Sequence, residues 1–120
     1  MDLVPYKQSL ELKNLGFDEP CFTWYWDDIG LYSGLEFGNH NKNINYVSAP
    51  TFSQALRFFR EKHNLYGFIT PAEKKDTKLR FSFHIVDNWD VNEIFDTPEE
   101  AEIGCIKKLI ELVKNKQNAQ

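Results

Sequence analysis

The sequence is poor in the residues that cross-link small secreted domains or bind metals. Its two cysteines, Cys21 and Cys105, lie 84 positions apart, and neither belongs to a Cys-x-x-Cys pair. This is no disulfide framework, and Cys105 is expected to be a small core residue. The histidines (His40, His63 and His84) are separated by 23 and 21 residues, whereas zinc ligands occur in closely spaced pairs. We therefore expect no metal site and no cofactor.

Long apolar runs, a basic excess and the common catalytic motifs are also absent. No apolar stretch approaches the ~20 residues that span a bilayer, and the opening MDLVPYKQSL does not resemble a signal peptide. The net charge of −4, from 14 basic and 18 acidic residues, disfavours duplex nucleic acid as a partner, although Lys74, Lys75, Lys78 and Arg80 form a local basic cluster. No GxxxxGKS/T, GxGxxG or GxSxG pattern occurs. We expect a cytoplasmic protein without a membrane-spanning segment.

Apolar and aromatic residues are plentiful enough for one core. Of the 120 residues, 42% are hydrophobic and 15% are aromatic, with ten Phe, five Tyr and three Trp. A chain of this length commonly folds as one unit without disulfides or metals. We expect residues 1–120 to form a single domain.

Three segments have the pattern of helices. Residues 5–15 begin with Pro5, which suits a first helical turn, and are followed by Gly16, which suits a helix stop. Residues 51–63 and 97–115 each open with a Thr-x-x-Gln or Thr-x-x-Glu capping box and continue with apolar residues at helical spacing.

Four segments have the composition of strands and pair in sequence as two hairpins. Their residues are 21–26 and 31–37, joined by a turn at 27–30, and 65–70 and 79–86, joined by a charged turn at 71–78. A short strand is also expected at 46–47, after an Asn-rich loop at 38–45. The predicted fold class is α+β in the order α-ββ-α-ββ-α, a two-layer domain with an antiparallel four-stranded sheet and its helices packed on one face.

The alternation along the strands predicts which residues the helices cover. The phenylalanines and tryptophans are expected beneath them: Phe22, Trp24, Trp26, Phe81 and Phe83. The other face then carries tyrosines with an arginine and a histidine, side chains that stack on rings and pair with phosphate. The residues predicted to bind a ligand or partner there are Tyr25, Tyr32, Tyr66, Arg80 and His84.

Three blocks of the sequence resemble a family of small proteins encoded by Bacteroidetes-type bacteria and by their prophages and phages. The blocks are ELKNLGFDEPCF (11–22), SAPTFSQALRFFREKHNLY (48–66) and TPEEAEIGCIKKLIELVKN (97–115). The resemblance implies a phage or mobile-element setting. It brings no catalytic or ligand residue with it, because the blocks are helix starts, helix stops and apolar stripes.

The leading functional hypothesis is a non-enzymatic interaction module that binds a protein partner or a second copy of itself. An alternative is a small-ligand or nucleotide-binding protein that uses the Tyr/Arg/His face. An enzyme is the third hypothesis, and it requires His84 to converge with acids at the strand ends, such as Asp87 and Asp90. No catalytic residue is assigned.

Overall fold

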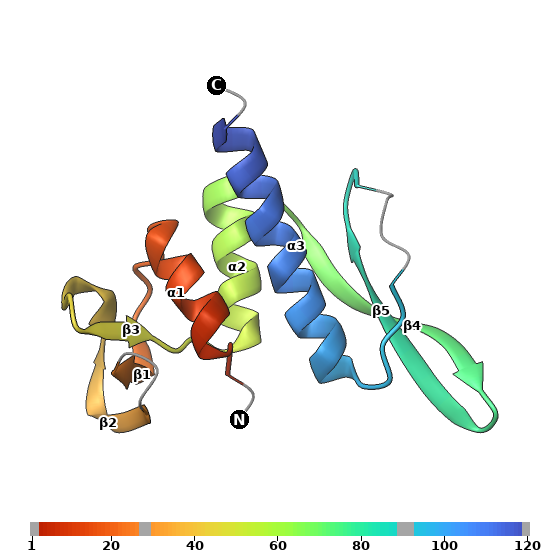
Figure 1. The fold of residues 1–120 in the computed structure, drawn as a ribbon, viewed down its shortest axis with the longest axis horizontal. Coiled ribbons are helices and arrows are strands. Elements are labelled where there is room, and N and C mark those ends of the chain that lie inside the picture. The colour runs from red at the N-terminus through yellow and green to blue at the C-terminus, as the bar shows by residue number, and fades with distance from the viewer. Residues whose placement is uncertain (1–2, 27–29, 89–92, 119–120) are drawn as a thin grey trace. The chain divides into compact units, whose positions relative to one another are not determined.

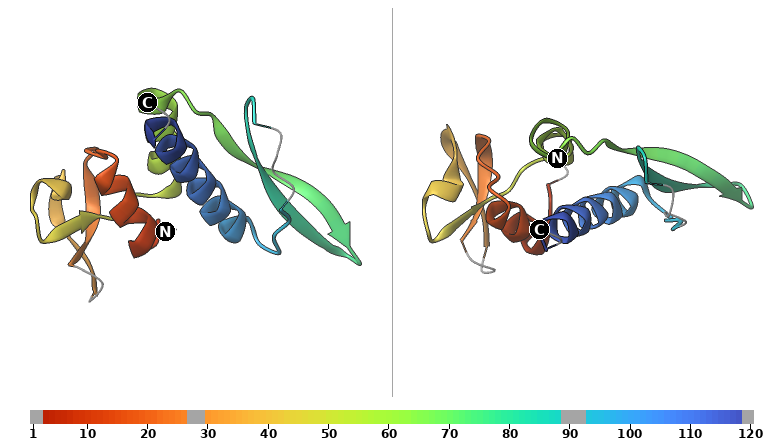
Figure 2. Two further views of the ribbon diagram at one scale, coloured as in Figure 1. Left: turned by 45° about the horizontal axis from the view of Figure 1, so that its top comes forward. Right: turned by 90° about the horizontal axis from the view of Figure 1, so that it is seen from above.

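The chain forms two compact units. The computed structural model describes residues 3–26, 30–88 and 93–118, with the backbone alone at 34–36. Unit 1 is Met1–Phe58 and unit 2 is Phe59–Gln120, so the division falls inside the second helix. Figure 1 shows the elements of each unit, and Figure 2 shows them from two further directions. The expectation of a single domain stays a prediction.

Unit 1 contains a three-stranded antiparallel sheet in the order β2-β1-β3. The strands are β1 (Cys21–Trp26), β2 (Gly30–Gly38) and β3 (Tyr46–Ser48). Trp24 of β1 lies opposite Tyr32 on one side and opposite Ser48 on the other. The short strand predicted near residue 46 is therefore confirmed, and it occupies the second edge of β1.

The polar loop between β2 and β3 contains a short 3-10 helix, η1 (His40–Lys42). The side-chain amide of Asn41 donates to the carbonyl oxygen of Phe17 at 2.8 Å, and its side-chain oxygen accepts from the N–H of Ser48 at 2.8 Å. These two bonds hold η1 beside β3 and so fix the position of His40. The turn predicted at 27–30 lies outside the described residues, apart from Gly30 at its end.

The first helix, α1 (Tyr6–Asn14), ends at the glycine that its sequence predicts. Gly16 has a φ of +91°, and its N–H donates to the carbonyl oxygen of Lys13 at 3.0 Å. The N–H of Phe17 donates to the carbonyl oxygen of Leu12 at 2.9 Å. These are the two bonds of a Schellman motif, whose positive φ glycine adopts without steric cost. Leu12 and Phe17 are both buried, so the helix stop also directs the chain into the core.

The second helix, α2 (Phe52–His63), starts with the predicted capping box. The N–H of Gln54 donates to the hydroxyl of Thr51 at 3.2 Å, and the N–H of Thr51 donates to the side-chain oxygen of Gln54 at 3.0 Å. Two backbone donors that the helix leaves unpaired are thereby satisfied. The helix is followed by Asn64, whose φ of +53° turns the chain out of the helix.

Unit 2 is a two-stranded hairpin with one long helix. Its elements are β4 (Gly67–Lys75), β5 (Lys78–Ile85) and α3 (Pro98–Asn118). The charged turn predicted at 71–78 is wrong, because the strands continue to Lys75 and resume at Lys78. Charged side chains are compatible with a strand whose two faces both meet water. Pro71 is tolerated because it lies at a register shift on an outer strand, where its missing N–H leaves no ladder bond broken.

Two glycines allow α3 and the hairpin to approach closely. A Cβ added to Gly67 on β4 would lie 2.7 Å from Sγ of Cys105 and 3.1 Å from Cδ1 of Leu109, both on α3. A Cβ added to Gly104 on α3 would lie 3.1 Å from Cε1 of Phe83 on β5 and 2.7 Å from Cζ of Phe95, which pairs with β5. Cys105 is fully buried, as the sequence predicts, and its sulfur lies next to Gly67 of β4.

The α+β class and the element order are confirmed, but the strands form two sheets instead of one four-stranded sheet. The second edge of β1 pairs with β3. Because β3 is close to β1 in sequence, closing the loop between them costs little conformational entropy. In unit 2, β5 pairs beyond β4 with Phe95: the N–H of Phe81 donates to the carbonyl of Phe95 at 2.8 Å, and the N–H of Phe95 returns a bond of 2.7 Å.

Candidate functional site

The orientation of β1 is the reverse of the predicted one. The hydroxyl of Thr23 donates to the carbonyl oxygen of Ala49 at 2.7 Å, and the hydroxyl of Tyr25 donates to that of Val4 at 2.8 Å. The Tyr25 ring also meets the edge of the Tyr6 ring on α1, at a centroid distance of 5.4 Å. The inner face of β1 therefore carries the side chains that can satisfy backbone carbonyls, and the Phe/Trp side faces outward.

The outward face of the unit 1 sheet carries a continuous layer of rings, which we call the aromatic face. It consists of Trp24, Trp26, Tyr32, His40 and Tyr46. Trp24 stacks on His40 at a centroid distance of 4.3 Å and lies 6.4 Å from Tyr32 and 6.0 Å from Tyr46. Trp26 lies 6.2 Å from Tyr32 and 6.3 Å from Tyr46. Trp26 is 49% exposed and Tyr32 is 41% exposed, so the layer is open to a partner.

His40 supports this layer from η1. Its Nε2 lies 3.0 Å from the carbonyl oxygen of Cys21, and its ring lies nearly parallel to Trp24, at an interplanar angle of 24°. Lys13 holds the neighbouring strand, because its ammonium donates to the carbonyl oxygens of Asn43 at 3.0 Å and Tyr46 at 2.6 Å. The bond from His40 to β1 thus fixes the ring beneath Trp24, and the bonds from Lys13 of α1 fix the backbone at Tyr46.

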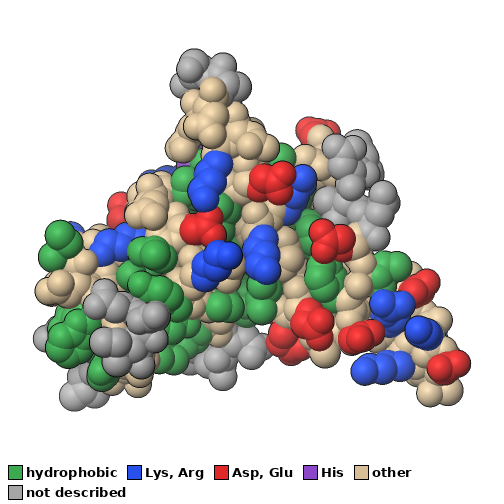
Figure 3. Space-filling model, in the orientation of Figure 1, with side chains coloured by type: hydrophobic (Ala, Val, Ile, Leu, Met, Phe, Trp, Pro, Cys, Tyr) green, Lys and Arg blue, Asp and Glu red, His purple; other side chains and the backbone are tan. Residues whose placement is uncertain are grey.

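An apolar cavity of about 360 Å³ also opens in unit 1, between β1, β2 and the start of α2. It is lined by Leu3, Phe22, Thr23, Phe37, Ala49, Thr51 and Gln54. Phe22 and Phe37 form its rim: their rings lie 4.4 Å apart, and they are 57% and 54% exposed. Hydrophobic side chains gather over β1 and β2 at the lower left of the space-filling view (Figure 3).

The polar atoms on the walls of this cavity already have partners within unit 1. The side-chain nitrogen of Gln54 donates to the carbonyl oxygen of Pro20 at 2.9 Å, and the side-chain oxygen of Gln54 serves the capping box with Thr51. The hydroxyl of Thr23 is bonded to Ala49. The cavity therefore offers apolar contact and suits a hydrocarbon group better than a polar one.

Charge around these features is mildly negative. Residues 1–58 contain four Lys and Arg and seven Asp and Glu, which gives unit 1 a net charge of −3. A surface that binds nucleic acid combines stacking rings with a positively charged groove. Unit 1 has the stacking rings, but its net charge is negative and does not favour the positively charged groove that nucleic acid requires.

The structure separates the residues predicted for one binding face. Tyr32 lies opposite Trp24, whereas Tyr25 lies opposite Leu31, so the two tyrosines occupy opposite faces of the unit 1 sheet. Tyr32 belongs to the aromatic face and Tyr25 to the inner side. Tyr66, Arg80 and His84 belong to unit 2.

Within unit 2, the three remaining predicted residues have contacts of their own. Arg80 forms ion pairs with Glu73 at 3.1 Å and with Asp96 at 3.3 Å. The His84 ring lies 5.2 Å from that of Phe68, which is opposite it on β4, and Tyr66 is half exposed just before β4. The orientation predicted for the second hairpin is confirmed at Phe83, which is buried on the side of β5 away from His84.

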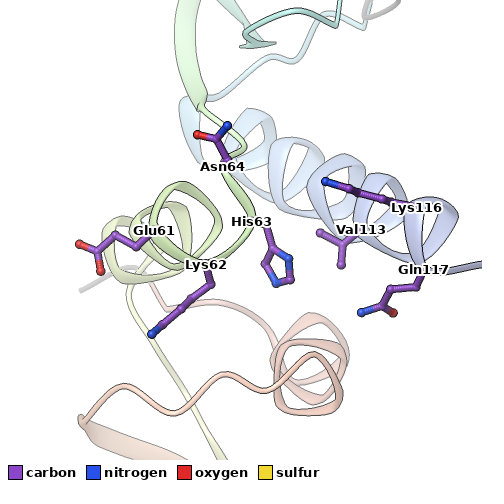
Figure 4. Close-up of a pocket in the computed structure, with 7 residues that line it drawn as sticks. All are labelled: Glu61, Lys62, His63, Asn64, Val113, Lys116 and Gln117. Carbon is purple, nitrogen blue, oxygen red and sulfur yellow. The ribbon is translucent and has the colours of Figure 1, made fainter. Parts of the chain in front are cut away.

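A polar cleft of about 390 Å³ lies in unit 2 between the ends of α2 and α3. Figure 4 shows the His63 ring at its centre, with the side chains of Lys116 and Gln117 extending from α3 toward it and Glu61 and Lys62 pointing away. Burial lowers the pKa of His63, and the positive charge of Lys116 lowers it further. His63 is therefore mainly neutral near pH 7.

Neither cysteine has the setting of a nucleophile. Burial raises the pKa of Cys21 to about 12, with a further increase from Glu19, and burial raises the pKa of Cys105 to about 12, helped by Glu102. The thiolate is the reactive form of cysteine, and it is scarce at such pKa values. Among the described residues, no three His, Cys, Asp or Glu side chains gather as metal ligands would. No described helix combines the length and apolar character that a membrane span requires.

Comparison with known proteins found no match among family models, curated proteins or solved structures. The interpretation of the site therefore depends on its own geometry.

Sequence reasoning missed most of the aromatic face. Trp24 and Trp26 were expected beneath the helices, and Tyr46 was assigned only to a short strand. The alternation of β1 contained a signal for which face is buried. Thr23 and Tyr25 carry hydroxyls that can donate to backbone carbonyls when enclosed, whereas the side chain of Phe22 cannot form a hydrogen bond.

Proposed function

We propose that this chain is a non-enzymatic protein-interaction module whose aromatic face and apolar cavity bind a polypeptide partner. The observation that carries the proposal is two pairs of exposed aromatic side chains in unit 1, each in ring contact: Phe22 with Phe37 at 4.4 Å and Trp26 with Tyr32 at 6.2 Å. Single exposed apolar residues are ordinary on protein surfaces, but contiguous ones are typical of binding sites.

The arrangement has the chemistry of an interface centre. Tryptophan and tyrosine dominate binding energies at protein interfaces because they bury a large apolar area with few rotatable bonds. Here the rings support one another through the contacts of Trp24, so little ordering remains for a partner to induce. The cavity beside Phe22 and Phe37 has room for an apolar side chain of the partner, and its walls leave hydrocarbon contact as the main attraction.

The expected setting is part of the same proposal. An accessory protein of a phage or mobile element that acts in the cytoplasm would keep its thiols reduced, and Cys21 and Cys105 are both free. The proposal leaves out catalysis by a thiol, because burial raises the pKa of both Cys21 and Cys105 to about 12.

A comparison of three proteins tests the proposal: the wild type, Trp26→Ser/Tyr32→Ser in unit 1, and Tyr66→Ser/Phe68→Ser in unit 2. The control pair also removes two half-exposed aromatic side chains. Each protein is used to select a displayed library of random peptides, and the enriched peptides are then measured by isothermal titration calorimetry.

We expect the wild type and the control to select peptides with a recurring aliphatic or aromatic anchor. The Trp26→Ser/Tyr32→Ser variant should bind those peptides about 30-fold or more weakly, since an interface hot spot contributes about 2 kcal/mol. Equal binding by all three proteins would remove the aromatic face from the proposal, and failure of the wild type to select any peptide would remove the proposal itself.

A further inference from the structure

The distal half of the β4–β5 hairpin projects from unit 2 as a two-stranded ribbon. In Figures 1 and 2 the hairpin extends beyond the N-terminal end of α3 in every view. Residues 71–79 are all exposed, in contrast to Gly67, Phe83 and Ile85, which are buried where the hairpin meets α3. The hairpin thus has an anchored half and a half whose side chains contact solvent on both faces.

Three lysines concentrate positive charge at the end of this ribbon, and we call Lys74, Lys75 and Lys78 the lysine tip. Lys75 and Lys78 lie directly opposite each other across the hairpin, an arrangement in which like charges repel. None of the three ammonium groups has a hydrogen bond or an ion pair with a described residue. The basic side chains at the lower right of Figure 3 lie over this end of the hairpin.

Two carboxylates of unit 2, those of Glu73 and Asp96, are engaged by Arg80 and not by the lysine tip. Glu73, which precedes the lysine tip on β4, pairs with Arg80 at 3.1 Å, and Asp96 pairs with the same arginine at 3.3 Å. Arg80 is therefore neutralised by two acids while the lysines are left to solvent. Asp76 lies in the turn itself, with a φ of +60°, and is the single acid between the strands.

We propose that the lysine tip binds an acidic segment of a polypeptide. Charge complementarity is the reason: the tip presents unpaired cations on both faces of a narrow ribbon in a chain whose net charge is −4. The same net charge opposes a nucleic-acid duplex, whose dense phosphates would extend past the tip onto the acidic remainder of the protein. A short acidic segment contacts the tip alone.

The contact is made by side-chain charge and not by strand addition. Pro71, the register shift between Pro71 and Glu73, and the lysines themselves all hinder another chain from pairing with the outer edge of β4. Lysine ammonium groups act as flexible point charges, so they accept carboxylates in many registers. We therefore expect binding that depends on the number of acidic residues and weakens steeply with salt.

Fluorescence anisotropy with labelled decaglutamate tests the inference on the full chain. The tip variant is Lys74→Gln/Lys75→Gln/Lys78→Gln. The matched control, Lys42→Gln/Lys62→Gln/Lys107→Gln, removes the same charge from exposed lysines outside the tip. Decaglutamine and a short DNA duplex of random sequence serve as comparison probes.

We expect the wild type and the control to bind decaglutamate alike, and the tip variant to bind about tenfold more weakly, since three exposed ion pairs are each individually modest. The tip variant should melt at the same temperature as the wild type or higher, because a like-charge pair is gone. Equal affinity of the tip variant and the wild type, or an equal loss in the control, would overturn the inference. Tighter, tip-dependent binding of the duplex would also overturn it, in favour of a nucleic-acid backbone.

Discussion

Adding a single methyl group at Gly67 probes the close approach between β4 and α3 at this residue. Its Cβ would lie 2.7 Å from Sγ of Cys105 and 3.1 Å from Cδ1 of Leu109. The first distance is well inside van der Waals contact, and Gly67 and Cys105 are both buried, so neighbouring groups must shift. Overpacking of this kind costs about 1–3 kcal/mol.

A smaller effect of Gly67→Ala acts in the opposite direction. The φ of Gly67 is not positive, so alanine adds no backbone strain, and its lower freedom in the unfolded chain stabilises the protein by about 0.4–1 kcal/mol. We expect a net loss of about 1–2 kcal/mol in the free energy of unfolding. Gly38→Ala is the control, because a Cβ there meets nothing within 4 Å, and it should be neutral or slightly stabilising.

A double-mutant cycle identifies the clash. In Cys105→Ala the sulfur is absent, so the cost of adding Gly67→Ala should fall by about 1 kcal/mol or more relative to the wild-type background. Urea unfolding, followed by circular dichroism, gives the four free energies. If Gly67→Ala costs the same in both backgrounds, or nothing in either, then the contact between β4 and α3 is not as close as we infer.

Three further predictions concern the inner side of unit 1, the polar cleft and the thiols. Tyr25→Phe should lower the free energy of unfolding by about 1 kcal/mol, since it removes a hydrogen bond, while Tyr32→Phe should leave it unchanged in the same urea titration. The pKa of His63 is lowered from 6.5, so between that lowered pKa and 6.5 the folded state binds fewer protons than the unfolded state, and stability should rise with pH in this window. His63→Gln should flatten this rise, and an unaltered slope would contradict the reasoning. With pKa values of about 12, Cys21 and Cys105 should react with a disulfide reagent at pH 8 only after unfolding, and rapid labelling of the native protein would oppose this.

The ends and starts of the helices could be predicted from local sequence, because they depend on residues that are neighbours in the chain. Gly16 ends α1, and Thr51 with Gln54 starts α2, because both motifs are closed by bonds between residues at most five positions apart. The same holds for Thr97, whose hydroxyl accepts from the N–H of Glu100 at 3.2 Å at the start of α3. Fold class and element order follow from such local patterns.

The candidate site was only partly predictable for a different reason. An alternating strand defines two faces, but it does not say which of them is buried when both carry aromatic rings. In β5 the apolar residues share one face, and Phe83 is buried as expected. In β1 both faces are aromatic, and the hydrogen bonds of Thr23 and Tyr25 to distant carbonyls decide the outcome.

By itself, the sequence determined where helices begin and end, which segments are extended, and that aromatic residues exceed what a small core encloses. Tertiary structure alone decided that β3 pairs with β1, that the hairpins join different sheets, and that Trp26, expected beneath the helices, faces the solvent. The physical reason is that strand pairing and burial depend on contacts between residues far apart in the chain. The choice between alternative pairings and buried faces rests on small free-energy differences between whole packings and not on the preference of any single segment.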